Sequence, residues 1–478
     1  MDEKYLRRMP FTGIVLAAAV AASLAASAAA PKYVFMFLGD GMSTPQRMIA
    51  EEFSLATGRG PLTLNHLKMQ STARTCSTTS LITDSAAAAT ALACGAKTYN
   101  GAAGVDNDGK PVENILEVAH RKGRKVGVVT SVTINHATPA GFCAHRKNRS
   151  YLYQIGLDLV DSPYEYFAGG GFDGKQNDKR DPKYRGDLLD LAAKAGFTVA
   201  TNLTEFRAFA PGRRAFYRGD DGELQYAIDA DGTQPTLAEM TAKGVELLDG
   251  PQGFFLFVEG GKLDHAGHAN DTATNLREVL ALDDAVRVAK EFLDKHPDET
   301  LILVTGDHET GGMAMGFGGS GYALHLRRLE RQRCSWERFE KIVKKARSSA
   351  KAEGRAFTFK DAQGLLEKWF GFDFGKVGRD SGDAAAGGKF AKRKKNAGRD
   401  DEVWLTAADI KRLENSFKRN GLQFTAIHIM SAKAGVGWSS TAHTALPVMC
   451  TSEGVGADSF TGLLDNTDVA KRLKALFD

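Results

Sequence analysis

Short apolar runs alternate with longer amphipathic stretches along most of the chain. Four of these runs are apolar at nearly every position and are bounded by Gly, Asp or Thr, at Tyr33–Leu38, Val126–Val132, Phe254–Val258 and Leu301–Thr305. Strands that are apolar on both faces are typical of a buried sheet, and their alternation with helices is typical of a parallel one. The pattern predicts an α/β fold with a mainly parallel central sheet flanked by helices on both faces.

Polar residues directly follow each of these strands, in the segments GDGMS, NHATPAG, EGGKLDHAGH and GDHETGG. In open α/β sheets, ligands bind outside the carboxyl ends of the parallel strands. We therefore expect a ligand site at this edge of the sheet.

The alternation of strands and helices stops between about Gly318 and Gln423. This stretch contains helix-like basic segments and a Gly/Ala/Lys-rich link at 381–399, so it is interpreted as an insertion over the core. The helix-like segments are Leu324–Ala350, Asp361–Trp369 and Thr406–Asn420.

Strands are expected to resume at Ala426–Met430 and Ala445–Thr451. The predicted organisation is a signal peptide at 1–30, a domain built on the sheet at 31–317 and 425–478, and a basic insertion or cap at 318–424.

The chain has 478 residues, of which 43% are hydrophobic and 25% charged. This balance is typical of a soluble globular protein and excludes disordered, collagen-like and multi-pass membrane proteins. Five cysteines without a CxxC pair argue against a disulfide scaffold, a zinc ribbon and a thioredoxin-like site. Since their number is odd, at least one is free or pairs with another molecule.

The net charge of +4 is unevenly distributed. Residues 321–420 contain 25 Lys and Arg against 14 Asp and Glu, a net charge of +11, so the other 378 residues carry −7. Runs such as Lys392–Lys395 can bind polyanions but are more often a solvated face, and we expect no specific nucleic acid binding. The insertion is left with three open roles: selecting anionic substrates, contacting membrane or cell-wall polymers, or keeping the protein soluble.

The first 30 residues have the pattern of a secretory signal. Lys4, Arg7 and Arg8 precede an apolar run at Phe11–Leu24, and small residues follow up to Ala30. About 14 apolar residues are too few to span a bilayer, which needs roughly 20. We expect cleavage near Ala28 or Ala30, by the Sec or the twin-arginine route, and a periplasmic or secreted protein without a transmembrane anchor. The alternative is an ordinary buried helix.

Candidate metal ligands lie in the segments that follow the strands. Asp264 and His268 are four residues apart, so one helical turn can bring both to a single ion. Asp307 and His308 follow a strand directly and can offer two ligands in one turn. Carboxylates with imidazoles suit zinc, whereas an all-oxygen set suits magnesium. The remaining candidates are the all-oxygen set Asp40, Thr138 and Glu259, together with His443.

Ser85 is the candidate nucleophile. It precedes a run of alanines that favours helix, and a hydroxyl at a helix start lies near backbone amides and the positive end of the dipole. A helix cap formed by Thr83, Asp84 or Ser85 is the structural alternative. The chain has no GxSxG elbow, so cations would have to activate the serine. Arg149 can clamp a phosphoryl group with two hydrogen bonds.

Six motifs together resemble the alkaline phosphatase family and occur in that family's order. They are GDGMS at Gly39–Ser43, TDSAAAATA at Thr83–Ala91, HATPAGFCAHRKNR at His136–Arg149, VEGGKLDHAGH at Val258–His268, VTGDHETGG at Val304–Gly312 and AHT at Ala442–Thr444. The resemblance spans about 30–320 and 425–478.

The resemblance implies two Zn²⁺ and one Mg²⁺. It assigns Asp40, Ser85, Asp307 and His308 to one zinc ion. The second zinc ion would be held by Asp264, His268 and His443, with His428 as the alternative to His443. Asp40, Thr138 and Glu259 would bind magnesium, and Arg149 would grip the phosphoryl oxygens.

Two positions vary within that family, where this chain has His136 and His265. Both are interpreted as residues behind the ligands that tune magnesium and phosphate contacts. A histidine pair could favour zinc at the third site, so the identity of that metal stays open.

The resemblance implies hydrolysis of small phosphate monoesters through a phosphoserine on Ser85, with a broad substrate range, activity that rises toward alkaline pH, and a homodimer as an open alternative. Three other functions were weighed. A phosphodiesterase of the same superfamily usually lacks the third metal site, and a sulfatase would need a C/S-x-P-x-R segment, which is absent. The third is an exported phosphate- or polyanion-binding protein with a vestigial metal site.

Overall fold

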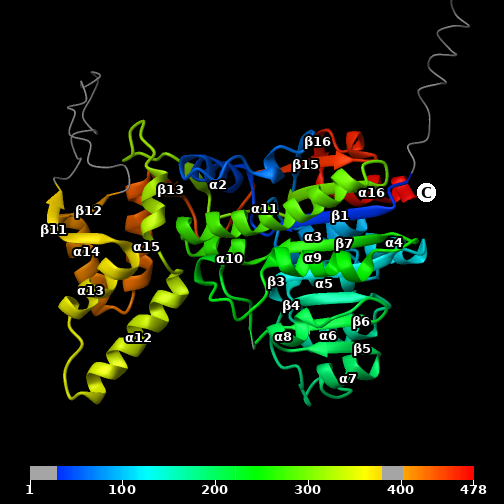
Figure 1. Ribbon diagram of the computed structural model, residues 1–478, viewed down its shortest axis with the longest axis horizontal. Coiled ribbons are helices and arrows are strands. Elements are labelled where there is room, and N and C mark those ends of the chain that lie inside the picture. Colours follow the sequence, from blue (N-terminus) through cyan, green and yellow to red (C-terminus); the bar gives the residue numbers. More distant parts are fainter. Residues whose placement is uncertain (1–29, 221, 379–401, 478) are drawn as a thin grey trace, which may run out of the picture.

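The computed structural model describes residues 30–220, 222–378 and 402–477 (Figure 1). The predicted signal peptide up to residue 29, the basic run Lys392–Lys395 and the link at 381–399 lie outside the described residues.

A ten-stranded sheet forms the centre of the molecule. Seven of its nine described strand pairings are parallel, and the two antiparallel ones both involve β15. The prediction of a mainly parallel sheet is therefore confirmed. In spatial order the strands are β16 (Gly462–Asp465), β2 (Met69–Arg74), β15 (Val448–Gly454), β8 (Thr300–Gly306), β1 (Tyr33–Gly39), β7 (Phe254–Gly260), β3 (Lys125–Thr133), β4 (Tyr166–Gly170), β6 (Arg214–Arg218) and β5 (Phe197–Ala200).

Helices cover both faces of this sheet, and consecutive residues of the central strands contribute to two separate cores. Phe35 and Phe37 pack on one face, whereas Val34 and Met36 pack on the other. The first face is covered by α2 (Thr44–Ala56), α8 (Leu203–Arg207), α9 (Leu237–Leu248), α10 (Lys262–His268) and α11 (Thr272–Lys295). The second is covered by α3 (Ser85–Cys94), α4 (Ile115–Arg121), α5 (Ala137–Cys143), α6 (Leu152–Asp161), α7 (Leu188–Lys194) and α16 (Asn466–Phe477).

The central strands end at the same level. In the parallel register of β1, Gly39 lies opposite Gly260 of β7 on one side and Gly306 of β8 on the other. The polar segments that follow these three strands therefore start side by side at one edge of the sheet, where ligands bind in this class of fold.

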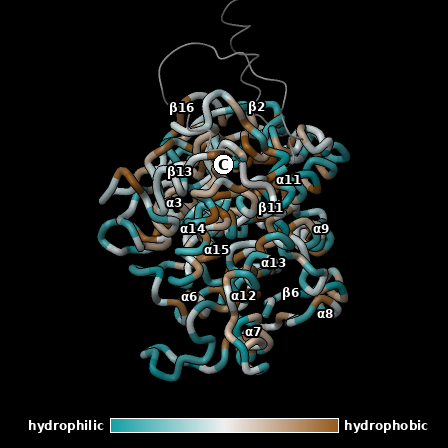
Figure 2. Tube along the Cα trace, turned by 90° about the vertical axis from the view of Figure 1, so that its left-hand side faces the viewer, coloured by the Kyte–Doolittle hydropathy of each residue, from teal (hydrophilic) through white to brown (hydrophobic). Residues whose placement is uncertain are grey.

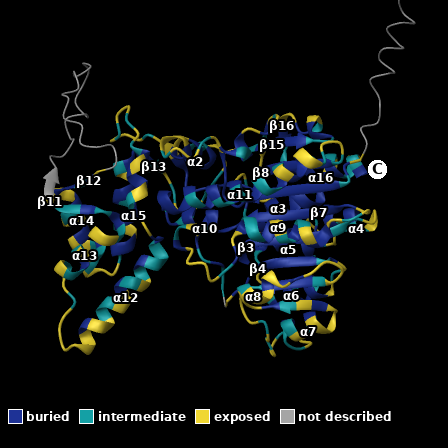
Figure 3. Cartoon of the chain, viewed as in Figure 1, coloured by how far each residue is buried: buried dark blue, intermediate teal, exposed yellow. Residues whose placement is uncertain are grey.

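The basic insertion lies to one side of the sheet (Figure 1) but shares its core. Phe339, Phe370 and Leu413 belong to the same buried cluster as Phe35 of β1. Figure 3 shows buried central strands and largely exposed outer turns of α12. The insertion contains the 3-10 turn Leu326–Arg331, α12 (Trp336–Ala352), α13 (Phe359–Phe370), β11 (Phe372–Gly378), β12 (Val403–Thr406) and α14 (Ala407–Lys418).

One predicted strand is wrong. Ala426–Met430 belongs to the helix α15 (Leu422–Ala434), which crosses the predicted boundary at 424. This helix packs against both α11 and α12, so it is apolar around most of its circumference. A short apolar run of this kind does not distinguish a buried helix from a buried strand. The other predicted strand, Ala445–Thr451, overlaps β15.

Four short strands and three 3-10 turns complete the described part of the chain. All five cysteines are free, and within the described ranges no helix has the length and hydrophobicity to cross a membrane. Viewed from the side, hydrophobic positions lie mainly inside the molecule (Figure 2). The short elements are β9 (Glu309–Thr310), β10 (Met313–Met315), β13 (Val436–Trp438), β14 (His443–Thr444), and the 3-10 turns Thr63–Asn65, Ala227–Asp229 and Ala457–Ser459.

Arg47 of α2 is completely buried and joins three separate parts of the chain. Its guanidinium donates hydrogen bonds to Asn65 Oδ1 at 2.8 Å, to Thr451 Oγ1 at 2.9 Å and to the Met449 carbonyl at 3.0 Å. Burial lowers the pKa of Arg47 to about 10, still well above neutral pH, so the group stays charged.

We expect Arg47→Met to lower the free energy of unfolding by about 3–5 kcal/mol, because it leaves several buried acceptors without a donor. The measurement is urea denaturation followed by fluorescence. Arg59→Met is the matched control, since Arg59 is partly exposed and pairs with Asp284, and it should change the value by about 1 kcal/mol or less. Equal effects of the two substitutions would contradict this account of Arg47.

Candidate metal centre

The candidate site lies at the carboxyl edge of the sheet, where three adjacent strands deliver one carboxylate each. Asp40 follows β1, Glu259 is the last residue but one of β7, and Asp307 follows β8; all three are 0% exposed. Asp264, on the helix that follows β7, is also buried. Four buried carboxylates therefore meet where the sequence predicted a ligand site.

Ser85 begins α3 and faces two of these groups. Asp84 is the N-cap of the helix, and its side chain accepts a hydrogen bond from the Ala87 amide. Ser85 Oγ lies 3.1 Å from His308 Nε2 and 3.5 Å from Asp40 Oδ1. The hydroxyl is thus buried at a helix N-terminus, beside candidate metal ligands rather than beside a free histidine base.

Asp40, Asp307 and His308 form the first candidate ligand group. His308 Nε2 lies 3.3 Å from both Asp40 Oδ1 and Asp307 Oδ2. The other oxygen of Asp307 accepts hydrogen bonds from the backbone amides of Gly41 and His308, which orients the carboxylate. Together with the Ser85 hydroxyl, this is the set that the resemblance assigned to one zinc ion.

Gly41 is required by this close packing. Its backbone has φ +70°, which disfavours other residues, and a Cβ there would lie 2.7 Å from Thr310 Oγ1 and 3.0 Å from Asp264 Oδ1. The glycine of the GDGMS motif therefore lets the loop after β1 approach the ligands.

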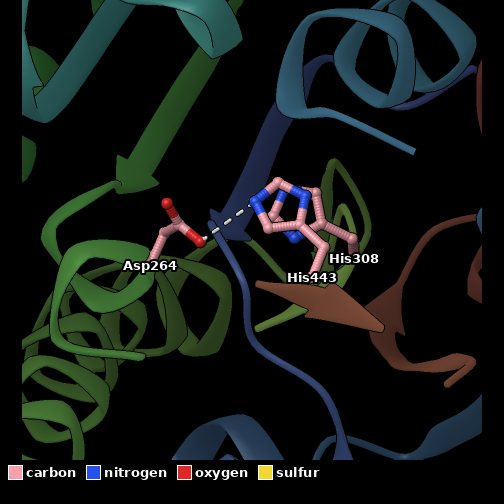
Figure 4. Close-up of side chains that lie close together, drawn as sticks. All are labelled: Asp264, His308 and His443. Atoms are coloured by element: carbon pink, nitrogen blue, oxygen red, sulfur yellow. Dashed lines mark ion pairs between the residues drawn. The ribbon is translucent and has the colours of Figure 1, made fainter. Parts of the chain in front are cut away.

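Asp264, His268 and His443 form a second group, of which Figure 4 shows Asp264 and His443 beside His308. His443 Nε2 lies 3.6 Å from Asp264 Oδ1 and 3.2 Å from His268 Nε2. The Nδ1 of each histidine is hydrogen-bonded to a backbone carbonyl. His268 Nδ1 contacts the Thr441 carbonyl, and His443 Nδ1 contacts the Thr83 carbonyl. Because a carbonyl only accepts, both Nδ1 atoms donate, and in the neutral rings both Nε2 lone pairs face the same point as the carboxylate. Converging acceptors of this kind fit a cation.

His308 joins this second group to the first. Its ring stacks on that of His443 with centroids 3.6 Å apart, and the two rings share a candidate ligand group with Asp264. His428, the alternative to His443, lies on α15 with its Nε2 3.3 Å from the Ala269 carbonyl, outside the candidate groups of the described residues.

The third group contains Asp40, Glu259 and His136. Thr138 Oγ1 lies 3.3 Å from Asp40 Oδ2, so the oxygen set that was assigned to magnesium is brought together around a shared Asp40. His136, interpreted from the sequence as lying behind the ligands, contributes a nitrogen within 4.8 Å of the two carboxylates.

Arg149 lies beside this third group. Its Nη1 donates to Asp84 Oδ2 at 3.2 Å, and its Nη2 lies 3.3 Å from His136 Nε2. The guanidinium is partly exposed and close to the helix start that carries Ser85. Asp84 therefore both caps α3 and orients Arg149.

The charges of the cluster are not balanced by the protein alone. Burial, followed by repulsion from neighbouring carboxylates, raises the pKa of Asp40 well above its usual value; burial does the same for Asp307. Burial also raises the pKa of Glu259 to about 7. Glu259 Oε1 and Asp307 Oδ2 are buried and accept no hydrogen bond. Bound cations would supply the missing positive charge and the missing partners, so these residues fit metal ions.

Two threonines at the site were not found from the sequence. Thr310 Oγ1 donates to Asp264 Oδ1 and lies 3.2 Å from His308 Nδ1, and Thr130 Oγ1 donates to Glu259 Oε2 at 2.5 Å. Thr310 follows His308 by two residues in GDHETGG, which was the available signal; Thr130 lies inside a buried strand and gave none.

The model of the family described as "Alkaline phosphatase" matches residues 31–160 and 216–478. The chain belongs to the alkaline phosphatase family. Alkaline phosphatase 4 of Bacillus subtilis is 33% identical over 401 residues, which cover 81% of this chain and 75% of the relative. The alkaline phosphatase of Schizosaccharomyces pombe is 36% identical over 308 residues, which cover 60% and 57%.

Solved structures of the family share the fold. A cold-active alkaline phosphatase from the psychrophile Shewanella sp. superimposes with a TM-score of 0.76 at 27% identity, covering 93% of this chain and all of the other. The Thermus thermophilus alkaline phosphatase gives 0.74 at 27% identity, covering 94% and 91%. Fold and enzyme class thus agree with the resemblance drawn from the motifs.

The uncompensated carboxylates of this family member predict how its stability depends on metal and pH. In the metal-free protein the raised pKa values of Asp40 and Asp307 oppose folding as pH rises above about 4, the ordinary aspartate value. We expect Asp307→Asn to raise the free energy of unfolding of chelator-stripped protein at pH 8 by about 1–3 kcal/mol and to abolish most of the gain on adding zinc.

Melting temperatures with and without zinc measure both effects. Asp294→Asn on α11 makes the same chemical change at an exposed pair with Lys290 and should alter neither value appreciably. A metal-free Asp307→Asn protein that is less stable than the unaltered chain would contradict the predicted repulsion.

Proposed function

We propose that the chain hydrolyses phosphate monoesters to an alcohol and inorganic phosphate through a covalent phosphoserine on Ser85. The observation that carries the proposal is the position of this hydroxyl. It lies at the N-terminus of α3, within 3.5 Å of Asp40 and His308, which belong to the first ligand group.

Three metal ions fit the three ligand groups. We assign one Zn²⁺ to Asp40, Ser85, Asp307 and His308, a second Zn²⁺ to Asp264, His268 and His443, and Mg²⁺ to Asp40, Thr138 and Glu259. The zinc assignments follow the imidazoles of the first two groups, and the magnesium assignment follows the oxygens of Asp40, Thr138 and Glu259; His136, whose nitrogen also lies in the third group, is not an assigned ligand. When bound, such ions act as Lewis acids that lower the pKa of a serine or a water and stabilise charge on the transferred phosphoryl group.

The reaction then proceeds in two in-line displacements. Ser85 loses its proton to solvent, and its Oγ attacks phosphorus opposite the ester oxygen. The Oγ–P bond forms as the P–O bond breaks, and the leaving alcohol takes a proton from water. Water next attacks phosphorus from the vacated side, which releases phosphate and restores Ser85. Two inversions leave the configuration at phosphorus retained.

Arg149 holds the non-bridging oxygens of the phosphoryl group during both steps. Its guanidinium is held by Asp84 near the start of α3, from which backbone amides also point toward a bound anion. Because this grip recognises the phosphoryl group and not the alcohol, we expect a broad range of small phosphate monoesters.

The third ligand group favours a monoesterase over a diesterase. Thr138 and Glu259 lie with Asp40 in one buried cluster. Export to the periplasm or medium rests on the first 30 residues and is part of this proposal.

The first test is hydrolysis of a chromogenic phosphate monoester between pH 7 and 11. We expect activity to rise toward alkaline pH, to disappear with chelator and to return with zinc plus magnesium, because Ser85 and water must both ionise. Ser85→Ala should lower kcat by about 10³-fold or more, since it removes the nucleophile. Ser150→Ala, an exposed serine, is the control.

A full metal load without turnover of monoesters would exclude the proposed reaction. Turnover of diesters alone would identify a phosphodiesterase, and phosphate binding without any turnover would identify a binding protein.

A second test addresses Arg149. We expect Arg149→Ala to weaken competitive inhibition by inorganic phosphate by about 10- to 100-fold, because a charge-assisted hydrogen bond contributes about 1.5–3 kcal/mol. Lys147→Ala removes an exposed cation of the same loop and should leave the inhibition constant unchanged. Equal inhibition constants for Arg149→Ala and the unaltered enzyme would exclude the phosphate contact.

A further inference from the structure

A continuous chain of charged contacts links the basic insertion to the third ligand group. Glu337 in the first turn of α12 lies 3.9 Å from the ammonium of Lys262. Lys262 Nζ donates to Glu223 Oε2 at 2.7 Å, and the same carboxylate contacts His265 Nδ1. The ring of His265 in turn lies edge-on to that of His136, with centroids 5.8 Å apart.

Lys262 has few alternatives to this arrangement. Only 3% of the residue is exposed, and its ammonium lies 3.8 Å from the centre of the Tyr226 ring. A buried ammonium requires a close anion, which Glu223 supplies. Burial alone would raise the pKa of Glu223, but the contacts with His265 and Lys262 lower it to about 2, so the carboxylate is charged at any working pH.

Glu223 holds the ring of His265 with both oxygens. Its Oε1 lies 2.9 Å and its Oε2 3.1 Å from Nδ1. A carboxylate behind an imidazole fixes both the ring orientation and the nitrogen that carries the proton. In this orientation His265 stands at 82° to His136 and is outside the third ligand group, which among the described residues contains Asp40, His136 and Glu259.

Space for another orientation exists beside the ring. A polar cavity of about 780 Å³ is lined by His136, Glu223, Lys262, His265 and Glu337, among others. Without its partner carboxylate, the His265 side chain can therefore rotate within this cavity to another staggered rotamer.

The catalytic part of the chain fixes the start of α12 and thereby the place of Glu337. Asp229 accepts a hydrogen bond from the Ser335 amide at 3.0 Å, and Asp271 accepts one from the Trp336 amide at 3.0 Å. Two buried carboxylates thus cap this helix N-terminus. Glu337 is consequently held against Lys262 rather than placed on a loose surface helix.

We propose that Glu223 and Lys262, supported by Glu337 of the insertion, are positioning residues that hold His265 out of the third ligand group and thereby make that site prefer magnesium to zinc. The third group already contains the nitrogen of His136, and a second imidazole nitrogen, that of His265, would favour zinc. The inference rests on the third metal site of the proposed function. It gives the basic insertion a role in metal selection.

The test measures metal preference without turnover. Chelator-stripped full-length protein is equilibrated with zinc and magnesium at fixed free concentrations, and bound metals are counted by mass spectrometry. We expect Glu223→Gln, which keeps the shape and removes the charge, to raise the zinc-to-magnesium ratio at the third site by about 10-fold or more. When zinc-loaded Glu223→Gln protein is titrated with magnesium, the third site should show a correspondingly weaker affinity for magnesium than in the unaltered chain.

A double variant separates positioning from a general loss of structure. In a His265→Ala background no second imidazole can join that of His136 at the site, so adding Glu223→Gln should leave the metal ratio unchanged. A single Glu223→Gln variant that melts at a lower temperature but keeps the original ratio would overturn the proposal, as would an equal shift in the two backgrounds.

Glu337→Gln provides a test that does not disturb the buried pair. This side chain is partly exposed, and its contact with Lys262 is longer, so the ratio should shift in the same direction by a smaller factor. Glu340→Gln, one turn along α12 and paired with Lys344, is the matched control and should cause no shift. Equal zinc-to-magnesium ratios for Glu337→Gln and Glu340→Gln would exclude a role of the insertion in metal selection.

These outcomes are independent of the proposed reaction. Monoester hydrolysis by the unaltered chain with no shift in Glu223→Gln would leave the function standing and overturn the inference. A shift of the metal ratio in Glu223→Gln without hydrolysis by the unaltered chain would support the inference and contradict the proposed function.

Discussion

The repulsion among four buried carboxylates governs the active edge of this structure. Four carboxylates are each at most 4% exposed: Asp40, Glu259, Asp264 and Asp307. Each belongs to at least one of the three ligand groups, and within a group the ligand atoms lie within 4.8 Å of one another. Hydrogen bonds from backbone amides and threonine hydroxyls satisfy only some of their oxygens. Bound cations would stabilise a fold that concentrates so much negative charge, so metal binding and folding are expected to be coupled here.

The register of the sheet explains how residues so far apart in sequence meet. β7, β1 and β8 end level with one another, which brings Glu259, Asp40 and Asp307 to one line of the edge. Ser85 lies at the start of α3, which covers the second face of the sheet. His443 lies in β14, which pairs with β9, and β9 directly follows His308. The rigid sheet fixes the positions of these residues, and most of the candidate ligands lie in the short segments that follow its strands.

Residues next to strands could be predicted from the sequence, because a local motif already specifies which edge of the sheet they occupy. The residues that could be predicted in this way are the central strands and the candidate ligands in GDGMS, LDHAGH and GDHETGG. Contacts formed only in three dimensions could not be predicted: Thr130 is hidden in an apolar strand, and Glu223 lies in an unmarked loop. Ala426–Met430 was mistaken for a strand because burial on all sides removes the period that separates helix from strand.

The basic insertion is best understood as part of the site rather than as a separate module. Its core is continuous with that of the sheet, and its first helix begins on two buried carboxylates, Asp229 and Asp271. Asp271 also caps α11, which follows the helix bearing Asp264 and His268. Any displacement of α12 would therefore disturb Asp271, which lies just after the helix that carries these residues, and the polar cavity beside His265 would change with it.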